Sequence, residues 1–507
     1  MTGLLGGDVA AFDMRLLAAL VSALLCSLAV WNLERSRSSL TMTPLTIGTT
    51  PATVYQRAGA AKAPAVIITH GFAGSRQLME AYSLTLAQAG YVAVSFDFEG
   101  HGRNPKPMSG DVESVDGTTQ LLKQEIGRVT DAVMALPGVD GRVALLGHSM
   151  ASDIIVRRAI EDRRVAATVA ISMFSEAVTA TEPRNLLMIS GAWEGFLRES
   201  AVRSAQLADP AAKEGDTIGD PAKAGGRRTV VAPSVEHVGV LYSATALLET
   251  RSWLDAVFGR VSNGPVAATG PWIALLLTGL VALAWPLAGL LPRNEAAASD
   301  PGLPLRPFLM AVLLPAVLTP PLLTLVDTRF LPVLVADYLA VHLLVYGLLS
   351  LGLLAWNGVR VGPFAWVAAA ALAAYGIFVF GGALDRYVAS FQPNAERLWI
   401  VAAMAIGAVP YMLADSLAVE GGRAALWRVF VARGAFLASL AVAVAFDFKR
   451  LFFLLIIIPV IVLFFVIFGL MGGFVGRRTM SPAAAGLGLG LILAWSLGVS
   501  FPMFLPG

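Results

Sequence analysis

The chain has 507 residues, of which 56% are hydrophobic and 14% are charged, and its net charge at pH 7 is +2. Soluble domains are about 45–50% apolar, so this composition excludes an ordinary soluble protein, and the near-neutral charge gives no reason to expect a nucleic-acid partner. The single cysteine excludes an intrachain disulfide.

An apolar segment at residues 16–33 predicts a membrane-spanning helix, because about 20 apolar residues cross a bilayer. The residues before it carry two aspartates against one arginine, and no small-residue cleavage motif follows it. This is not the pattern of a cleaved secretory signal. We therefore predict an uncleaved anchor at 1–33 and, at 34–63, a linker with edge strands.

A glycine-rich loop follows the next apolar run. The run at 65–69 has the character of a buried strand, and the sequence HGFAGS at 70–75 comes directly after it. A loop in this place can aim a backbone N–H at a developing negative charge, and the N–H of Phe72 is our candidate donor. An ordinary turn would also use such glycines.

The most informative motif is GHSMA at 147–151, which follows an apolar run and precedes a helix-like stretch. A serine at a sharp strand-to-helix turn is the nucleophile elbow of serine hydrolases, and crowding there requires small residues two positions before and after it. Gly147 satisfies this requirement fully, and Ala151 nearly satisfies it. Ser149 is therefore the candidate nucleophile, and the N–H of Met150 is the second candidate oxyanion donor.

A serine hydroxyl needs a neighbouring base, and the base needs an acid that orients it. Of five histidines, three adjoin glycines in tight turns and one lies in a strongly hydrophobic segment, which leaves His237 after the strand predicted at 229–236. The acid is expected between serine and histidine. Glu194, after the buried strand predicted at 185–190, is the first candidate, and Glu176 is the alternative.

Together these motifs resemble the α/β-hydrolase superfamily, most of all its dienelactone-hydrolase and serine-aminopeptidase-like members. The resemblance covers roughly residues 53–260 and implies a mostly parallel, doubly wound sheet. It does not identify a substrate, since the superfamily includes esterases, lipases, thioesterases, peptidases, acyltransferases and inactive members.

Two further features are interpreted through this resemblance. Asp97 and His101 lie in the sequence DFEGHG, which is similar to a family turn, so we expect them to be structural. Ala151 stands where the family usually has glycine, and it is expected to tighten the elbow slightly.

The rest of the chain is lipophilic. Residues 64–260 form the predicted α/β-hydrolase domain, 261–270 a linker, and 271–507 a membrane domain of about eight helices. The predicted spans are 271–291, 307–326, 333–355, 363–382, 398–417, 430–446, 451–471 and 483–503. With the anchor, the hydrolase domain is inserted between the first and second spans of a multi-pass protein whose membrane domain is all-α and whose partners include membrane lipids.

The distribution of basic residues bears on orientation. With alternating spans, the loops opposite the hydrolase domain contain eight arginines and those on its own side five Lys or Arg; adding Arg35, Arg37 and Arg260 equalises the count. The positive-inside rule therefore leans towards an exported, periplasmic hydrolase domain in a bacterial inner membrane. Within the spans, Asp415 is expected to make an interhelical hydrogen bond.

The sequence thus predicts a membrane-embedded serine hydrolase that cleaves an acyl ester or thioester, expected to be lipid-derived, through an acyl-serine. No metal-ligand spacing or cofactor motif is present, so neither group is expected. Two alternatives remain open. One is an acyltransferase that uses the same triad, and the other is a non-catalytic channel, transporter or assembly subunit with a hydrolase-fold recognition domain.

Overall fold

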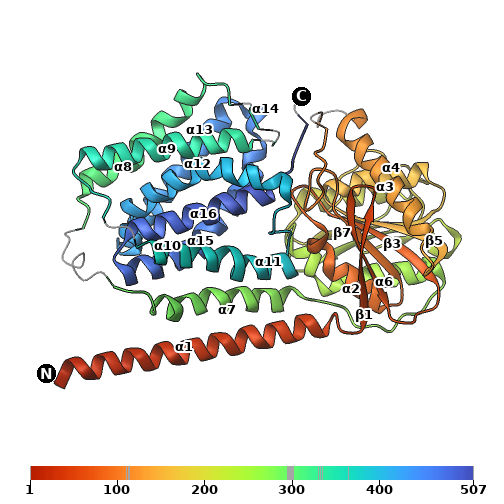
Figure 1. Ribbon diagram of the computed structural model, residues 1–507. Coiled ribbons are helices and arrows are strands. Elements are labelled where there is room, and N and C mark those ends of the chain that lie inside the picture. The colour runs from red at the N-terminus through yellow and green to blue at the C-terminus, as the bar shows by residue number, and fades with distance from the viewer. Residues whose placement is uncertain are drawn as a thin grey trace. The chain divides into compact units, whose positions relative to one another are not determined.

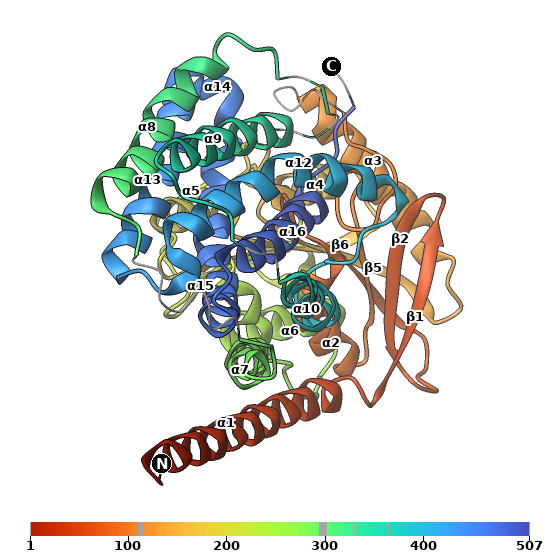
Figure 2. The same ribbon diagram turned by 60° about the vertical axis from the view of Figure 1, so that its left-hand side comes forward.

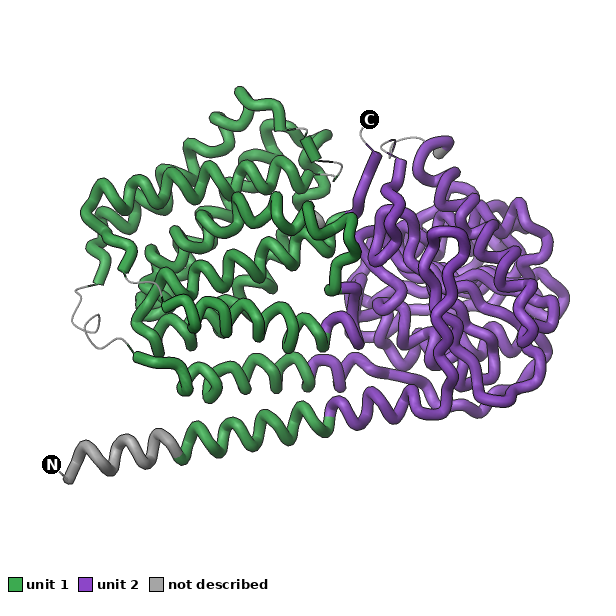
Figure 3. Tube along the Cα trace, viewed as in Figure 1, with its two compact units in different colours: residues 1–28, 275–383, 391–501 green, residues 29–274, 384–390, 502–507 purple. Residues whose placement is uncertain are grey.

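A computed structural model describes most of the chain, in two compact units (Figure 3). The described residues are 2–109, 111, 115–293, 302–328, 330, 331, 333, 335–362 and 365–505. Unit 2 consists of residues 29–274, 384–390 and 502–507, and unit 1 consists of residues 1–28, 275–383 and 391–501.

Unit 2 is built on one mostly parallel sheet, which has nine strands among the described residues (Figures 1 and 2). The strands are β1 (Leu40–Ile47), β2 (Thr50–Arg57), β3 (Ala63–Thr69), β4 (Val92–Phe96), β5 (Val139–His148), β6 (Val165–Ile171), β7 (Leu186–Gly191), β8 (Thr217–Ile218) and β9 (Arg227–Ala232). Their order is β1-β2-β4-β3-β5-β6-β7-β9-β8. The six central strands from β4 to β9 are parallel, whereas β1, β2 and β8 pair antiparallel at the edges. This confirms the predicted doubly wound sheet.

Helices cover both faces of this sheet. They are α2 (Glu80–Gln88), α3 (Gln120–Met134), α4 (Met150–Glu161), α5 (Gly195–Gln206) and α6 (Ala244–Phe258). One core cluster joins Leu187 and Ile189 of β7 to α2 and α6, and a second joins Leu186 and Met188 to α4 and α5. Because alternate residues of a strand face opposite sides, both faces are buried, and loops at the carboxyl ends of the parallel strands remain to form a site.

Unit 1 is helical. It contains most of α1 (Thr2–Arg35) and of α7 (Gly270–Ala288), then α8 (Leu305–Leu323), α9 (Ala336–Trp356), α10 (Trp366–Ala374), a π-helical turn (Tyr375–Phe380), the start of α11 (Gly381–Tyr387), α12 (Ala395–Ala418), α13 (Leu426–Phe446), α14 (Phe448–Leu451), α15 (Phe453–Thr479) and α16 (Pro482–Ser500). Nine helical segments among the described residues are long and apolar enough to cross a membrane. These segments are compatible with a multi-pass membrane protein; residues 363 and 364, where one predicted span begins, lie outside the described residues.

Small residues allow close packing inside unit 1. A Cβ at Gly486 of α16 would lie 2.7 Å from the Met412 carbonyl oxygen of α12, and one at Gly490 would lie 2.7 Å from the Cα of Val409. Glycines of this kind let membrane helices approach backbone to backbone.

Asp415 has a charged partner in the same unit. Its carboxylate on α12 lies 3.5 Å from the guanidinium of Arg433 on α13. Pairing reduces the cost of holding a charge in hydrocarbon. The predicted interhelical contact of Asp415 is therefore present as an ion pair.

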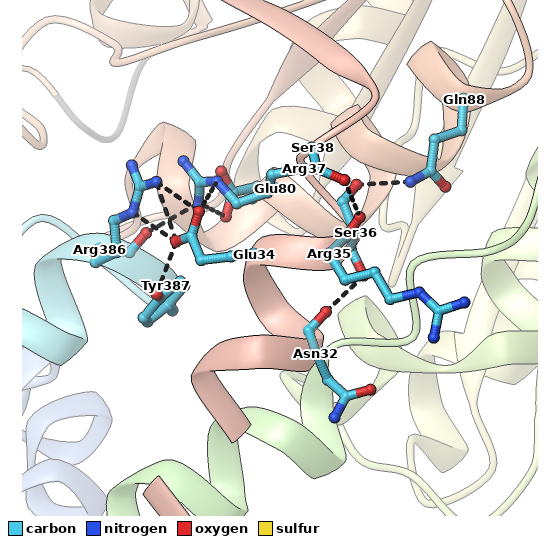
Figure 4. Close-up of polar contacts among 10 residues, drawn as sticks. All are labelled: Asn32, Glu34, Arg35, Ser36, Arg37, Ser38, Glu80, Gln88, Arg386 and Tyr387. Atoms are coloured by element: carbon cyan, nitrogen blue, oxygen red, sulfur yellow. Dashed lines mark hydrogen bonds and ion pairs between the residues drawn. The ribbon is translucent and has the colours of Figure 1, made fainter. Parts of the chain in front are cut away.

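A short segment that follows the π-helical turn belongs to unit 2 rather than unit 1. The Arg386 guanidinium donates two hydrogen bonds of 3.1 Å to the Glu34 carboxylate, and the Tyr387 hydroxyl donates one of 2.7 Å to it. Beside them, Arg37 donates to Glu80 of α2 at 2.8 Å (Figure 4). Charged and polar side chains thus hold residues 384–390 against the rest of unit 2.

The same segment and residues near the C-terminus contact the loops that follow β3 and β4. Arg103 donates to both carboxylate oxygens of Asp385, at 2.8 and 2.6 Å, and the Ser390 N–H donates to Ser75 Oγ at 3.0 Å. Met503 exchanges backbone hydrogen bonds of 2.8 Å with Gly100 and Met108. The loops that follow β3 and β4 are therefore held by residues far away in the sequence.

Replacing Arg37 by alanine is expected to destabilise the protein, because Glu80 would be left buried without its partner. Breaking a buried ion pair in this way costs about 3–5 kcal/mol. Burial raises the pKa of Glu80 to about 7, although Arg37 opposes the shift. The unfolded pKa of a glutamate is about 4.3. Because the folded pKa of Glu80 is higher, Glu80 contributes stability that is fully present below about pH 4.3 and is lost as the pH rises through about 7. Above that pH the buried carboxylate is charged and needs Arg37 as its partner.

The loss of thermal stability in Arg37→Ala should therefore be larger at pH 8 than at pH 5. It is measured as the apparent Tm of the full-length protein in detergent, with Arg37→Lys as the variant that keeps the charge. An equal loss at both pH values would show that the Glu80 charge is not responsible.

Candidate active site

Ser149 stands at the corner between β5 and α4. Its backbone has φ of +53° and ψ of −120°, a conformation that costs a residue with a side chain about 1–3 kcal/mol. A Cβ at Gly147 would lie 2.8 Å from Thr69 Oγ1 and 2.9 Å from the Ala151 carbonyl oxygen. Only a residue without a side chain fits there, and Ala151 is fully buried. The geometry is that of a nucleophile elbow.

His237 reaches this serine from the loop after β9. Its Nε2 lies 2.9 Å from Ser149 Oγ, and its Nδ1 lies 2.5 Å from Glu194 Oε1. When Nδ1 carries a proton and donates a hydrogen bond to the carboxylate, Nε2 keeps a lone pair that can accept the serine proton.

Glu194 lies between β7 and α5 and is buried. Its second oxygen, Oε2, accepts hydrogen bonds from the Gly191 N–H at 2.6 Å and from Ser172 Oγ at 2.8 Å. Burial raises the pKa of Glu194, but the hydrogen bonds from His237, Gly191 and Ser172 outweigh burial, so the pKa lies below its usual value. The carboxylate is therefore charged at neutral pH and can stabilise an imidazolium.

The alternative acid occupies a different position. Glu176 is exposed and lines the cavity in front of Ser149. Among the described residues, its carboxylate makes no hydrogen bond to His237. The structure thus brings Ser149, His237 and Glu194 together and leaves Glu176 apart.

His148 contributes a contact that the sequence did not indicate. Its Nε2 lies 2.8 Å from the carbonyl oxygen of His237, and the two rings are 4.8 Å apart. Burial, with the nearby His237, lowers the pKa of His148 to about 3. The ring is therefore neutral at physiological pH and, with the proton on Nε2, donates to the carbonyl and holds the loop that carries His237. Only its place beside the nucleophile could have suggested this role.

The loop at 70–75 lies beside the nucleophile, since a Cβ at Gly71 would be 3.0 Å from Ser149 Cβ. Met150 lines the cavity at the start of α4. The two sequence-predicted donors, the N–H groups of Phe72 and Met150, therefore come from segments that adjoin Ser149. Their role as an oxyanion hole stays a prediction.

His70 and Asp97 make structural contacts. His70 Nε2 accepts the Phe98 N–H at 3.2 Å, so its Nδ1 is the donor to the Gly71 carbonyl at 2.8 Å. Asp97 accepts the N–H groups of Arg76 at 2.8 Å and Arg103 at 3.0 Å, and it pairs with the Arg76 side chain. These bonds join the loop after β3 to the loop after β4.

A cavity of about 390 Å³ opens in front of Ser149 and His237. Leu197, Ile154 and Phe174 supply apolar lining, and Phe174 stacks on Phe196 with ring centroids 5.6 Å apart. These two phenylalanines are 47% and 61% exposed. An exposed aromatic pair, of which Phe174 lines the cavity, is suited to an apolar ligand. Asp153, Arg157 and Glu176 make another part of the lining charged. Among the described residues, no group of three or more potential metal ligands is found.

Comparison with known proteins identifies this domain. Residues 60–209 match the family model of serine aminopeptidases, S33. Unit 2 is thus an α/β-hydrolase domain, and the helical unit is consistent with a membrane domain. No curated protein matches the chain.

Solved structures also align with the chain. They include a hypothetical protein from Pseudomonas aeruginosa, with 13% identity over 43% of this chain and 92% of that one and a TM-score of 0.33. A membrane phospholipase A, a bacterial virulence factor, has 14% identity over 51% and 99% and a TM-score of 0.32. A predicted CIB-like hydrolase from Thermoplasma acidophilum has 13% identity over 42% and 97% and a TM-score of 0.33. These values are too low to carry any conclusion about the reaction.

Proposed function

We propose that the protein is a multi-pass membrane serine hydrolase that cleaves acyl esters or thioesters through a covalent acyl-Ser149. The observation that supports this most directly is the continuous hydrogen-bonded series from Ser149 Oγ through His237 to Glu194. A hydrolase-family domain makes hydrolysis the expected class of reaction, and the series of contacts supports a serine as the nucleophile.

The geometry supports a two-step reaction. Ser149 Oγ attacks the acyl carbonyl carbon while His237 Nε2 takes the proton of the serine hydroxyl. The oxyanion that forms accepts hydrogen bonds from the N–H groups of Met150 and Phe72. The intermediate collapses, the bond to the leaving group breaks, and His237 returns the proton to that group. Water then attacks the acyl-serine, again through His237, and the carboxylic acid leaves. Glu194 remains charged throughout and fixes the imidazole tautomer.

We propose a lipid-derived acyl group as substrate and an exported position for unit 2. The apolar part of the cavity lining, the exposed Phe174–Phe196 pair and the apolar helices of unit 1 support an apolar acyl chain. The distribution of loop arginines supports the periplasmic side of a bacterial inner membrane.

The test uses the full-length protein in detergent micelles with p-nitrophenyl esters and acyl thioesters, and it identifies the acyl product. Free acid supports hydrolysis. Acyl transfer to an added alcohol or amine in preference to water would indicate an acyltransferase. If no turnover occurs and a fluorophosphonate probe does not label the folded protein, the non-catalytic alternative is favoured.

Replacing both Phe174 and Phe196 by serine is expected to reduce kcat/KM for long-chain esters about 10- to 100-fold and to leave short-chain esters nearly unchanged. Burying one large apolar side chain contributes about 1.5–3 kcal/mol, and we expect a long acyl chain to cover more of this pair than a short one. Leu207→Ser, which removes another exposed apolar side chain at the end of α5, is the matched control. Equal losses for short and long chains would contradict an acyl-binding role.

A further inference from the structure

Unit 1 contains a cavity of about 290 Å³ whose lining is dominated by arginine. Arg15 comes from α1, Arg293 follows α7, and Arg477 and Arg478 lie in the last turn of α15. We call this the four-arginine cavity. In Figure 1, α7 lies next to α1, and Cys26 of α1 lies against Gly279 of α7. The Arg15 side chain lies against Gly289 just after α7.

The positive charge of this cavity is not balanced within the described residues. There, Arg15 and Arg293 make no hydrogen bond or ion pair, and no carboxylate lies within 4 Å of any of the four guanidinium groups. Four like charges around one small space repel one another. A bound anion would relieve this repulsion.

Two of the arginines are held in place and still have donors to offer. Arg477 donates to the Gly422 carbonyl at 2.8 Å, and Arg478 Nε donates to the Leu291 carbonyl at 2.8 Å. A guanidinium has five N–H groups, so most remain available. Fixed guanidinium groups that converge are the preferred protein ligands for phosphate oxygens.

The cavity lies where three membrane spans end. Arg15 is near the start of the span Asp13–Arg35, whereas Trp285 and Arg477 are near the ends of Gly270–Ala288 and Phe453–Thr479. Trp285, which lines the cavity, is 37% exposed, as is usual for tryptophan at a membrane–water interface. Basic pockets between membrane helices at this depth bind anionic lipid headgroups.

An apolar groove adjoins the four-arginine cavity and shares Arg477 with it. The groove has a volume of about 410 Å³. Phe430 and Leu437 of α13 and Val462 and Val466 of α15 line it, and an added Cβ at Gly434 would meet nothing within 4 Å, so this glycine leaves the space open. A cationic cavity that continues into an apolar groove matches a molecule with an anionic head and a hydrocarbon chain.

We propose that unit 1 binds an anionic phospholipid, with the phosphate in the four-arginine cavity and an acyl chain in the apolar groove. The site is separate from Ser149 and does not depend on hydrolysis. A lipid phosphate and a free phosphate share the same recognition chemistry, so the experiment includes both.

The test measures lipid retention by native mass spectrometry on delipidated full-length protein, in the Ser149→Ala background so that lipid is not consumed. Phosphatidylglycerol and phosphatidylcholine are offered in equal amounts. Arg15→Gln/Arg293→Gln removes two charges that make no hydrogen bond or ion pair among the described residues. At about 1 kcal/mol for each arginine, it should weaken phosphatidylglycerol binding roughly 30-fold. Phosphatidylcholine should bind weakly to both proteins.

The matched control is Arg306→Gln/Arg360→Gln, which removes two exposed arginines beside other spans, outside the cavity. It should retain phosphatidylglycerol as the parent does. Equal weakening in both double variants, or no preference over phosphatidylcholine, would overturn the proposal. Competition by inorganic phosphate with the same affinity as the lipid would assign the cavity to a soluble anion and overturn it as well.

Discussion

Ser149→Ala is expected to abolish labelling by a fluorophosphonate probe and to lower kcat on acyl esters by a factor on the order of 10⁶. The alanine keeps the Cβ but has no oxygen to attack the carbonyl carbon. His237 and Glu194 are expected to keep their mutual contact, so the loss would be chemical rather than structural. Labelling is measured on the full-length protein, and the modified residue is identified by peptide mass spectrometry.

Ser200→Ala provides the control for this substitution. Ser200 is a buried serine of α5 in the same unit, and it has no part in the proposed mechanism, so labelling and turnover should stay close to those of the parent. If the probe still labelled Ser149→Ala, another residue would be the nucleophile.

The local motifs could be predicted because each is contained in a few consecutive residues. The elbow at Ser149 is specified by small residues two positions away on each side, and the backbone shows why, since a Cβ at Gly147 would collide with Thr69. Glu194 and His237 each follow a strand of a parallel sheet, and such strands bring their carboxyl ends to one edge. The order of the strands therefore explains why Ser149 and His237, which are 88 positions apart in the sequence, lie within hydrogen-bonding distance.

Other contacts depend on the folded chain and leave no local pattern. Nothing in the sequence near Asp385 or Ser390 indicates that these residues hold Arg103 and Ser75. The pairing of Met503 with Gly100 uses backbone groups, which every residue has. The position of His148 against the carbonyl of His237 is likewise fixed by tertiary structure alone.

Glu194→Gln is expected to lower kcat by a factor on the order of 10⁴ while the fold stays intact. The glutamine amide can donate a hydrogen bond to Nδ1 of His237, which stabilises the tautomer that carries its proton on Nε2. That tautomer has no lone pair facing Ser149 Oγ, and the neutral amide does not stabilise the imidazolium. Steady-state kinetics on a short-chain ester give the size of the loss, and an unchanged apparent Tm shows that the fold is intact.

Glu176→Gln is the matched control, because it makes the same chemical change in a carboxylate that lines the cavity without contacting His237. It should retain nearly full turnover. The opposite result, with Glu176→Gln inactive and Glu194→Gln active, would transfer the orienting role to Glu176. Glu194 Oε2 also accepts hydrogen bonds from the Gly191 N–H and the Ser172 hydroxyl. Ser172→Ala should lower kcat less than Glu194→Gln does, because the carboxylate keeps its charge and the hydrogen bond from Gly191.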